Sequence, residues 1–395
     1  MDIELSARVK KIKPSPTLAV SARAAELKAQ GKDIIGLGVG EPDFDTPQHI
    51  KEAAIKAINS GFTKYTAVDG TAGLKKAILH KFASENNLHY QAKQILVSCG
   101  GKQSFYNLAQ ALLNPGDEVI IPAPYWVSYP DMVLLAEGTP VIVTAGIEQN
   151  FKITPEQLER SITAKTRLFV INSPTNPTGV TYSRAELAAL GEVLLRHPHV
   201  LVATDDMYEH IRWDNQPFSN ILNTTPQLYE RTIVLNGVSK AYSMTGWRIG
   251  YAAGPAPLIA AMTNIQSQST SNPASISQVA AQEALAGDQT CIQTMVAAFK
   301  ERHDFVVHAL NEIPGVKCLQ TTGAFYAFPS FHGLIERMTG IADDVELGTY
   351  ILNKVGVALV PGSAFGAPGY MRLSFAADMA TLQKALTRLR SLVPN

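Results

Sequence analysis

The sequence predicts an α/β fold with a mostly parallel seven-stranded sheet between helices, plus a smaller α+β domain. From Gln94 to about Ala253, short β-rich runs alternate with turns and longer stretches of helical period. After Ala253 the pattern changes to long amphipathic stretches. The length of 395 residues corresponds to roughly two to three domains of about 150 residues, enough to bury a core and form a cleft between domains.

The alternating part of the chain supplies the expected sheet. Its strands are predicted at Ile95 to Ser98, Glu118 to Pro122, Pro140 to Thr144, Arg167 to Ile171, Val200 to Thr204, Thr232 to Leu235 and Arg248 to Ala252. Helices are predicted over Lys102 to Leu113, Ser128 to Glu137, Pro155 to Ile162 and Arg184 to Leu195. Strands that alternate with helices favour a parallel sheet covered on both faces. Functional side chains are then expected at the carboxyl ends of the strands.

The last part of the chain predicts the smaller unit. Amphipathic stretches from Ile276 to Ala286 and from Gln289 to Glu312 precede strand candidates at Ala324 to Phe328 and Met371 to Phe375. We expect residues 46–285 to form a large domain and residues 286–395 a small carboxyl-terminal domain. Residues 1–45 are expected to form an amino-terminal arm and part of the small domain.

Charge and hydropathy indicate small-molecule partners. Lys plus Arg and Asp plus Glu both number 34, so no long-range field favours nucleic acid or an anionic membrane. The longest apolar runs, such as Val355 to Pro361, are far shorter than the roughly 20 residues that cross a bilayer. The segment Met1 to Val20 lacks the apolar core of a secretory signal. A cytoplasmic or organelle-matrix protein is expected.

The cysteines predict neither a disulfide framework nor a metal site. Cys99, Cys291 and Cys318 are widely spaced and form no CxxC pair. We interpret all three as reduced and structural, and expect no metal.

The strongest chemical signal is the run from Ser239 to Arg248, which follows a predicted strand. A lysine among small and apolar residues at a strand end, here Lys240, can lose hydration and become partly neutral and nucleophilic. Arg248, eight residues later, can donate two hydrogen bonds to a phosphate. An isolated lysine would more simply be a solvated turn residue. In this context, however, the run resembles the lysine signature of class I aminotransferases, in which the lysine forms a Schiff base with pyridoxal phosphate.

A second mark of that family is the turn from Asn172 to Gly179, Asn-Ser-Pro-Thr-Asn-Pro-Thr-Gly. Two prolines and a glycine make a rigid loop that can aim the Asn176 amide into a cleft. The resemblance implies that Asn176 contacts the ring oxygen of the cofactor and the substrate carboxylate. Without it, a turn-stabilising asparagine would be the simpler interpretation.

The segment Asp205 to Tyr208 ends the predicted strand Val200 to Thr204. A carboxylate aimed at the ring nitrogen keeps that nitrogen protonated and improves the ring as an electron acceptor. The resemblance gives this role to Asp205, and implies that Tyr208 donates to the ring oxygen. Asp206 stands where the family usually has Glu. Either acid could instead cap a helix.

Phosphate binding is expected at Gly100, Gly101 and Lys102, where bare backbone amides meet a helix start. The GxxxxGK[ST] nucleotide-binding spacing is absent. Trp126 resembles the aromatic residue that stacks on the cofactor ring, although core packing is a rival role. Gly237 departs from the family, because many members place a phosphate-binding serine there.

Three further residues resemble family positions near the two ends of the chain. Gly40 corresponds to the glycine whose backbone touches the substrate α-carboxylate. Arg372 lies within an apolar strand, where its charge is costly unless a carboxylate pairs with it, and by resemblance it binds the α-carboxylate. Tyr65 resembles the tyrosine that reaches the cofactor phosphate of the neighbouring subunit. The resemblance therefore implies a homodimer with shared active sites.

The resemblance spans about residues 10 to 390 and implies the fold type I of pyridoxal phosphate-dependent transferases. The implied activity is ping-pong transamination through Lys240, which carries the α-proton, between amino acids and 2-oxo acids. The chain looks most similar to aspartate aminotransferases in which Lys102 meets the distal carboxylate. The arm of these enzymes closes over the substrate and lends hydroxyls, here from Ser15 and Thr17. Transamination between L-aspartate and 2-oxoglutarate is thus expected.

Other substrates and other classes remain as alternatives. The same branch includes enzymes that accept prephenate, and a broader aromatic or alanine aminotransferase is also open. Lys102 could instead be a surface lysine or a phosphate ligand. A dinucleotide-dependent oxidoreductase is disfavoured, because Glu41 stands where the run Gly36 to Gly40 would need its third glycine. A regulator that only senses the cofactor would need an added DNA-binding module.

Overall fold

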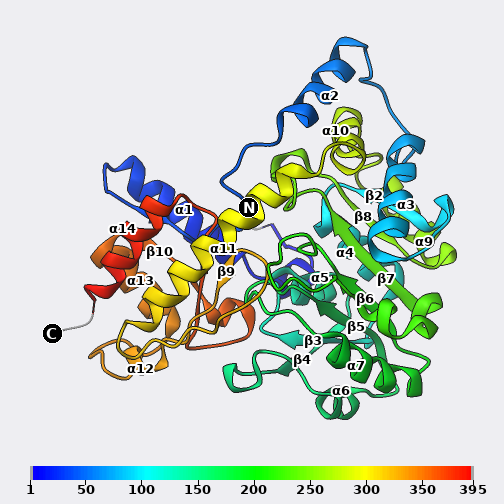
Figure 1. The fold of residues 1–395 in the computed structure, drawn as a ribbon. Helices are drawn as coiled ribbons and strands as arrows, with labels where there is room; N and C mark the ends of the chain where they lie inside the picture. Colours follow the sequence, from blue (N-terminus) through cyan, green and yellow to red (C-terminus); the bar gives the residue numbers. More distant parts are fainter. Residues whose placement is uncertain (1–2, 393–395) are drawn as a thin grey trace.

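The structure is a computed structural model that describes residues 3–392. The first two residues of the predicted arm and the last three of the predicted small domain lie outside this range. Figure 1 shows the large sheet and its helices on one side of the molecule and a smaller unit on the other, with the long helix α11 (Thr290–Asn311) running between them.

The large sheet has seven strands in the order β2-β8-β7-β6-β5-β3-β4. Their bounds are β2 (Ile95–Ser98), β3 (Glu118–Ala123), β4 (Thr139–Thr144), β5 (Thr166–Asn172), β6 (Leu201–Asp205), β7 (Thr232–Gly237) and β8 (Gly250–Ala253). Strands β7, β6, β5, β3 and β4 are parallel, whereas β8 runs antiparallel to both its neighbours. The predicted mostly parallel sheet of seven strands is confirmed.

The last predicted strand is wrong at its start, because Arg248 is not in β8. Arg248 follows the short 3-10 helix η5 (Thr245–Trp247) with a φ of 58°. Because this φ is positive, the chain turns at Arg248 before it enters β8. The Arg248 guanidinium donates to the carbonyls of Thr245 and Cys99.

Helices cover both faces of the large sheet, and the strands alternate their side chains between the two cores. Leu168 and Val170 of β5 lie in a core with α4 (Gly101–Leu112), α5 (Ser128–Leu135) and α9 (Ala256–Ser267). Phe169 and Ile171 face a second core, to which α2 (Gln48–Asn59), α3 (Ala72–Asn86), α6 (Pro155–Ser161), α7 (Arg184–Arg196) and α10 (Ser275–Ala286) contribute. This two-residue alternation is what a strand buried on both faces requires.

Several helices were not predicted from the sequence. They are α1 (Pro16–Ala29), α2, α3, α8 (Ile221–Thr224), α9, α12 (His332–Ile335), α13 (Asp344–Val355) and α14 (Met379–Arg390). The chain also forms short 3-10 helices besides η5, which are η1 (Val9–Lys11), η2 (Ala92–Gln94), η3 (Ile147–Gln149), η4 (Pro226–Arg231) and η6 (Gly362–Phe365).

The smaller unit contains two small sheets. One has the order β11-β12-β9, formed by β9 (Tyr326–Ala327), β11 (Val360–Pro361) and β12 (Met371–Ser374). In the other, β1 (Ile35–Gly36) pairs in parallel with β10 (Val357–Ala358). Residues of β1 therefore pack with the carboxyl-terminal part of the chain, while the domain boundaries themselves stay a prediction.

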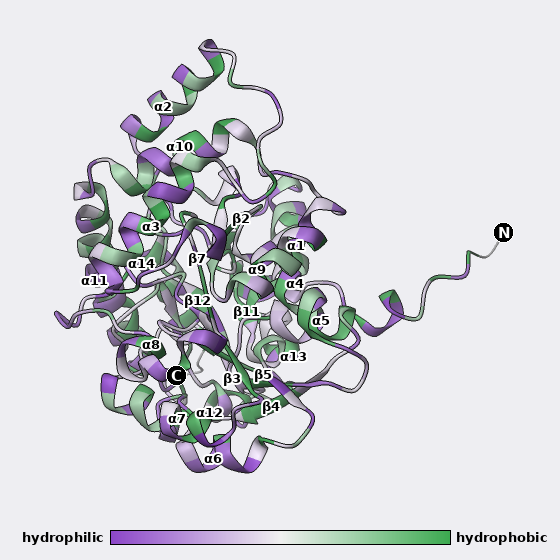
Figure 2. Ribbon diagram, turned by 90° about the vertical axis from the view of Figure 1, so that its right-hand side faces the viewer, coloured by the Kyte–Doolittle hydropathy of each residue, from purple (hydrophilic) through white to green (hydrophobic). Residues whose placement is uncertain are grey.

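The segment before α1 extends away from the body of the molecule (Figure 2), and it carries exposed apolar side chains at Ile3, Leu5 and Val9. Within residues 3–392, no helix is long and apolar enough to cross a membrane.

Candidate active site

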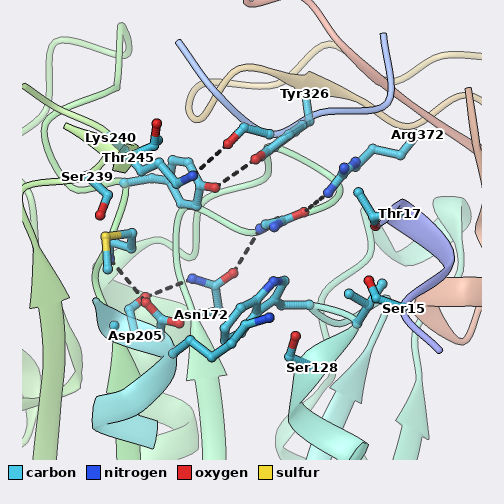
Figure 3. A pocket seen from close by; sticks show the side chains of 18 of the residues that line it. Ser15, Thr17, Ser128, Asn172, Asp205, Ser239, Lys240, Thr245, Tyr326 and Arg372 are labelled. Atoms are coloured by element: carbon cyan, nitrogen blue, oxygen red, sulfur yellow. Dashed lines mark hydrogen bonds between the residues drawn. The ribbon is translucent and has the colours of Figure 1, made fainter. Parts of the chain in front are cut away.

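A cavity of about 310 Å³ lies where the large sheet meets the smaller unit. Strand ends supply much of its lining, since Asn172 ends β5, Asp205 ends β6 and Lys240 follows β7. Arg372 enters from β12 of the smaller unit, and Ser15 and Thr17 lie at the start of α1 (Figure 3). The carboxyl ends of the parallel strands thus form the site, as the sequence predicts.

Most of the residues singled out in the sequence line this cavity. They are Ser15, Thr17, Gly40, Gly101, Lys102, Trp126, Asn176, Asp205, Tyr208, Lys240, Arg248 and Arg372. Gly100 does not line it but lies against the Arg248 guanidinium, which a Cβ at that position would overlap. Tyr65 does not line the cavity either, and its side chain is 92% exposed.

The amine of Lys240 is held inside the cavity. It donates a hydrogen bond to the carbonyl of Gly40 at 2.6 Å. Burial, reinforced by the positive charge of Arg372, lowers the pKa of Lys240 to about 8. With a pKa of about 8, roughly a tenth of the Lys240 amine is neutral at pH 7, and this neutral form is both a nucleophile and a proton acceptor.

The carboxylate of Asp205 faces the cavity without a cationic partner. It accepts hydrogen bonds from the Tyr129 hydroxyl and, at 3.2 Å, from the Met207 amide. Among residues 3–392, no Lys, Arg or His forms an ion pair with it. Burial raises the pKa of Asp205, and the bond from Tyr129 opposes that rise. Such a carboxylate suits a ligand that carries a protonated nitrogen.

Arg372 presents the complementary charge and is 2% exposed. Its guanidinium donates to the Asn176 side-chain oxygen at 2.9 Å and to the Gly38 carbonyl at 2.6 Å. Its Nε has no hydrogen-bond partner, and no carboxylate in the described chain pairs with the group. A buried guanidinium without a counterion is destabilising, so this position fits an anionic ligand.

The asparagines of the Asn-Ser-Pro-Thr-Asn turn connect these charges. The side-chain oxygen of Asn172 accepts from the Asn176 backbone amide at 2.8 Å, and its amide donates to the Asp205 backbone carbonyl at 2.8 Å. The turn after β5 therefore holds Asn176 toward Arg372 and is tied to the end of β6.

A phosphate-sized anion fits the other end of the cavity. Helix α4 begins at Gly101, so its free backbone amides and positive helix end face the site. The Arg248 guanidinium lies over Gly100, whose φ of 86° suits glycine, and it pairs with no carboxylate among the described residues. The residues present thus offer a phosphate cradle, a nucleophilic amine and a carboxylate for a ring nitrogen, which together fit pyridoxal phosphate.

The structure gives a physical reason for the departure at Gly237. A Cβ at this buried position of β7 would lie 3.0 Å from both the Gly250 Cα and the Ile249 carbonyl oxygen. A serine would therefore require the facing backbone of β8 to shift by a few tenths of an ångström. Ser239, the first residue of the run that contains Lys240, lines the cavity.

The remaining wall carries Lys102 and Trp126. The Lys102 ammonium lies 5.3 Å from the centre of the Trp126 ring, a cation–π contact. Burial, with the nearby charge of Arg248, lowers the pKa of Lys102. No carboxylate pairs with this lysine in the part of the chain that the structure describes. The Thr17 hydroxyl, at the start of α1, is buried without a hydrogen-bond partner.

The sequence did not indicate two functional candidates, Tyr129 and Tyr326. Tyr129 lies three residues after Trp126 at the start of α5, a helical spacing that could have indicated a second site residue. Tyr326 lines the cavity from β9, and no motif marked it.

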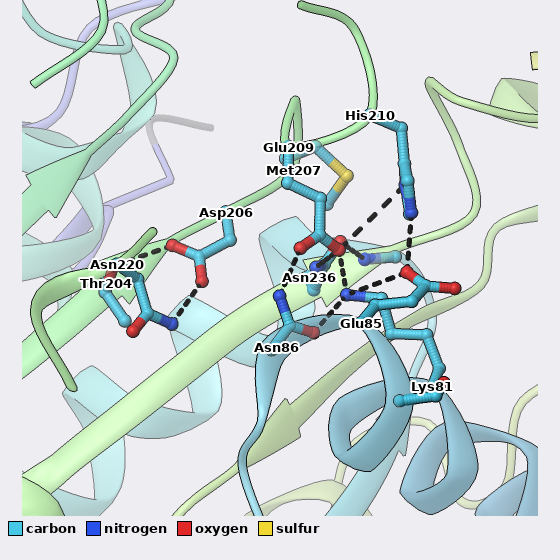
Figure 4. A network of polar contacts seen from close by, with 12 residues as sticks. Lys81, Glu85, Asn86, Thr204, Asp206, Met207, Glu209, His210, Asn220 and Asn236 are labelled. Atoms are coloured by element: carbon cyan, nitrogen blue, oxygen red, sulfur yellow. Dashed lines mark hydrogen bonds and ion pairs between the residues drawn. The ribbon is translucent and has the colours of Figure 1, made fainter. Parts of the chain in front are cut away.

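A buried polar network supports the segment that carries Asp205 and Tyr208 (Figure 4). Lys81 of α3 is 1% exposed and donates to Glu209, which also accepts from Asn86 and Asn236 at 2.7 Å each. Asn236 of β7 in turn accepts from the Gly237 amide at 2.7 Å. The network thus fixes the segment after β6 to α3 and β7.

The chain also shares its sequence and fold with known proteins. A family model described as aminotransferase class I and II matches residues 32–389. An aspartate/prephenate aminotransferase of Nitrosomonas europaea is 62% identical over 99% of this chain and 100% of that protein. A second, of Cereibacter sphaeroides, is 56% identical over 98% of each chain.

Solved structures give the same assignment. An aspartate aminotransferase of Rhizobium meliloti superposes with a TM-score of 0.95 at 48% identity, covering 99% of this chain and 98% of that one. The Thermus thermophilus aspartate aminotransferase with maleate gives a TM-score of 0.93 at 41% identity, covering 99% and 100%. The chain therefore belongs to the class I and II aminotransferase family, whose cofactor is pyridoxal phosphate.

Proposed function

We propose that this aminotransferase transfers the amino group of L-aspartate to 2-oxoglutarate, giving oxaloacetate and L-glutamate. The observation that carries the proposal is the pair of cations in one cavity, Arg372 and Lys102, neither of which has a carboxylate partner among the described residues. All four of these compounds carry two carboxylates. The relatives' names, which include aspartate, support the same choice.

In this proposal each carboxylate has its own partner. Arg372 offers a fork of two N–H groups to the α-carboxylate, assisted by Asn176. Lys102 meets the distal carboxylate, and Ser15 and Thr17 can donate hydroxyl hydrogen bonds to it from α1. The segment 266–275, in which another branch keeps a side-chain arginine, contains no basic residue.

Pyridoxal phosphate supplies an aldehyde that links to amines and a ring that accepts the electron pair released at the substrate α-carbon. The chain's own groups control the protons. The Lys240 amine, with its lowered pKa, is the group that takes the α-proton and returns it. Asp205 holds the proton on the ring nitrogen, and Tyr208 donates to the ring oxygen.

Prephenate is a second candidate acceptor. Relatives 62% and 56% identical are named aspartate/prephenate aminotransferases. Prephenate also carries two carboxylates, so Arg372 and Lys102 suit it in the same way as they suit 2-oxoglutarate.

We further infer a homodimer with shared active sites. The support is an exposed apolar surface along α2 and the segment after it, formed by Ile55, Ile58, Phe62 and Tyr65. Ile3, Leu5 and Val9 of the projecting amino-terminal segment are exposed as well. Such patches mark protein interfaces, and by family resemblance Tyr65 reaches the phosphate of the other subunit. Sedimentation of the purified protein should give a dimer.

The deciding experiment is a panel of amino donors with 2-oxoglutarate, oxaloacetate and prephenate as acceptors. Aspartate and glutamate should exceed alanine and phenylalanine in kcat/KM. Equal values for dicarboxylic and neutral donors would overturn the aspartate assignment. Transfer from aspartate or glutamate to prephenate would establish the second acceptor.

A further inference from the structure

Tyr326 contacts two functional side chains at once. Its hydroxyl lies 2.8 Å from the hydroxyl of Tyr208, and both tyrosines are buried. The face of its ring lies 4.6 Å from the guanidinium carbon of Arg372. Figure 3 shows Tyr326 between Lys240 and Arg372 at the top of the cavity. One side chain therefore joins a residue that faces the cofactor to the residue proposed for the substrate carboxylate.

The position of Tyr326 is tightly constrained. It belongs to β9, which pairs with β12, and its register partner Ser374 is two residues from Arg372. Its hydroxyl occupies the place where a Cβ at Gly40 would lie, so only a glycine there allows this approach. Because the Gly40 carbonyl also accepts from Lys240, Tyr326 packs directly against the backbone that holds the lysine.

Two aromatic rings lie against the Arg372 guanidinium. Phe365, which ends η6, lies 4.9 Å from the guanidinium carbon, against 4.6 Å for Tyr326. Stacking on a ring face restrains a guanidinium without using its N–H groups. The arginine thus stays oriented, and its Nε–H and the N–H groups that do not bond to Asn176 or Gly38 are available to a carboxylate.

We propose that Tyr326 is a positioning residue for both half-sites: its hydroxyl orients Tyr208 toward the cofactor, and its ring orients Arg372 toward the substrate carboxylate. This inference rests on the proposed roles of Tyr208 and Arg372. When Tyr208 donates to the cofactor ring oxygen, the 2.8 Å contact requires Tyr326 to be the donor to Tyr208. A hydroxyl that accepts such a bond becomes a better donor.

The two effects can be separated by substitution. Tyr326→Phe removes the hydroxyl and keeps the ring, Phe365→Leu removes only the other ring that contacts Arg372, and Tyr326→Leu removes both hydroxyl and ring. Two measurements on the holoenzyme follow the two halves. The absorbance of the lysine-linked cofactor, titrated against pH, reports the hydrogen bond from Tyr208 to the ring oxygen. The Kd of succinate, a dicarboxylate that cannot react, reports how well Arg372 binds a carboxylate.

Tyr326→Phe should raise the pH midpoint of the absorbance change by about half to one unit. Without the Tyr326 hydroxyl, Tyr208 is a weaker donor, so the cofactor ring oxygen keeps more negative charge and holds the proton that it shares with the lysine linkage more tightly. The same substitution should leave succinate affinity unchanged. Phe365→Leu should weaken succinate by about 5- to 30-fold with the midpoint unchanged. Tyr326→Leu should produce both changes. Because the phenylalanine variant is nearly isosteric, it tests the hydroxyl even if the leucine variants fold poorly.

Tyr90→Phe is the matched control, because Tyr90 lies outside the cavity and its buried hydroxyl has no partner in the described chain. It should change neither quantity. An unchanged midpoint in Tyr326→Phe, or unchanged succinate affinity in Tyr326→Leu, overturns the proposal. If instead the wild-type protein shows no pH-dependent band or does not bind succinate, the proposed function itself fails.

Discussion

The Lys240 amine donates to the carbonyl of Gly40 across 2.6 Å, although the two residues lie 200 positions apart in the chain. Lys240 follows β7 of the large sheet, whereas Gly40 lies just after β1, which pairs with β10 of the smaller unit. The lysine is therefore held at the junction of the two units. There it is shielded from solvent and close to Arg372, and both conditions lower its pKa.

The lowered pKa of Lys240, about 8, predicts how cofactor attachment depends on pH. Only the neutral amine attacks the aldehyde, so the rate should rise about tenfold per pH unit below pH 8 and level off above it. An ordinary lysine would keep rising to about pH 10. Cofactor-free protein mixed with pyridoxal phosphate and followed by absorbance gives this rate. Lys240→Ala should form no linked band, and a wild-type rate still rising at pH 10 would contradict the pKa argument.

Lys102→Ala should change specificity more than catalysis. Loss of a charged hydrogen bond to the distal carboxylate should lower kcat/KM for aspartate and glutamate by about 10- to 100-fold. Alanine and phenylalanine lack that carboxylate and should change little, so they serve as internal controls. Steady-state rates with the four donors measure the effect. An equal loss for every donor would instead make Lys102 a cofactor ligand.

Tyr129→Phe should impair the site through Asp205. The hydrogen bond from Tyr129 opposes the burial that raises the pKa of Asp205, so its loss raises that pKa further. The Asp205 carboxylate then takes up its proton at a higher pH, so the acid limb of the activity profile should move to higher pH. We expect kcat to fall by about 3- to 30-fold, compared with about 100- to 1000-fold for Asp205→Asn.

The pH profile separates this effect from general damage. Tyr350→Phe, on α13 and outside the cavity, should keep the wild-type profile. A Tyr129→Phe enzyme with lower activity but an unshifted acid limb would show that Tyr129 does not act on the Asp205 carboxylate.

The large sheet could be predicted almost completely from the sequence, because its strands are short apolar runs separated by turns. Helix α3 could not be predicted in the same way. Its buried face includes Lys75, Lys81 and Asn86, so the apolar period is broken. Lys75 pairs with nearby Asp69, but Lys81 and Asn86 both bond to a residue far away in the chain. Lys81, for example, bonds to Glu209, 128 positions away.

The site residues also divide into those that local motifs indicate and those that only long-range contacts bring together. Motifs with local spacing indicated Asn176, Asp205 and Lys240, which the structure brings to one cavity. The contacts of Tyr129 with Asp205 and of Tyr326 with Tyr208 join residues 76 and 118 positions apart. No local pattern marks such pairs, since they exist only once the strands and helices are assembled.

Lys81→Met should destabilise the fold strongly, because it leaves the buried Glu209 carboxylate without its cation. Burial alone would raise the pKa of Glu209, but the adjacent Lys81 charge lowers it to about 2. Glu209 therefore contributes stability above its unfolded pKa, about 4.3, and loses it as the pH falls through about 2. We expect Lys81→Met to lower the free energy of unfolding by about 3 to 5 kcal/mol at pH 7. The loss should be smaller at pH 4, where the unpaired Glu209 can take up a proton.

Urea denaturation of the holoenzyme at the two pH values measures this loss. Lys300→Met is the matched control, because Lys300 forms an exposed i,i+4 pair with Asp304 and should contribute less than about 1 kcal/mol. Adding Glu209→Gln to Lys81→Met removes the uncompensated charge and should recover part of the loss. A Lys81→Met protein as stable as the Lys300→Met control would show that the network does not stabilise the segment that carries Asp205 and Tyr208.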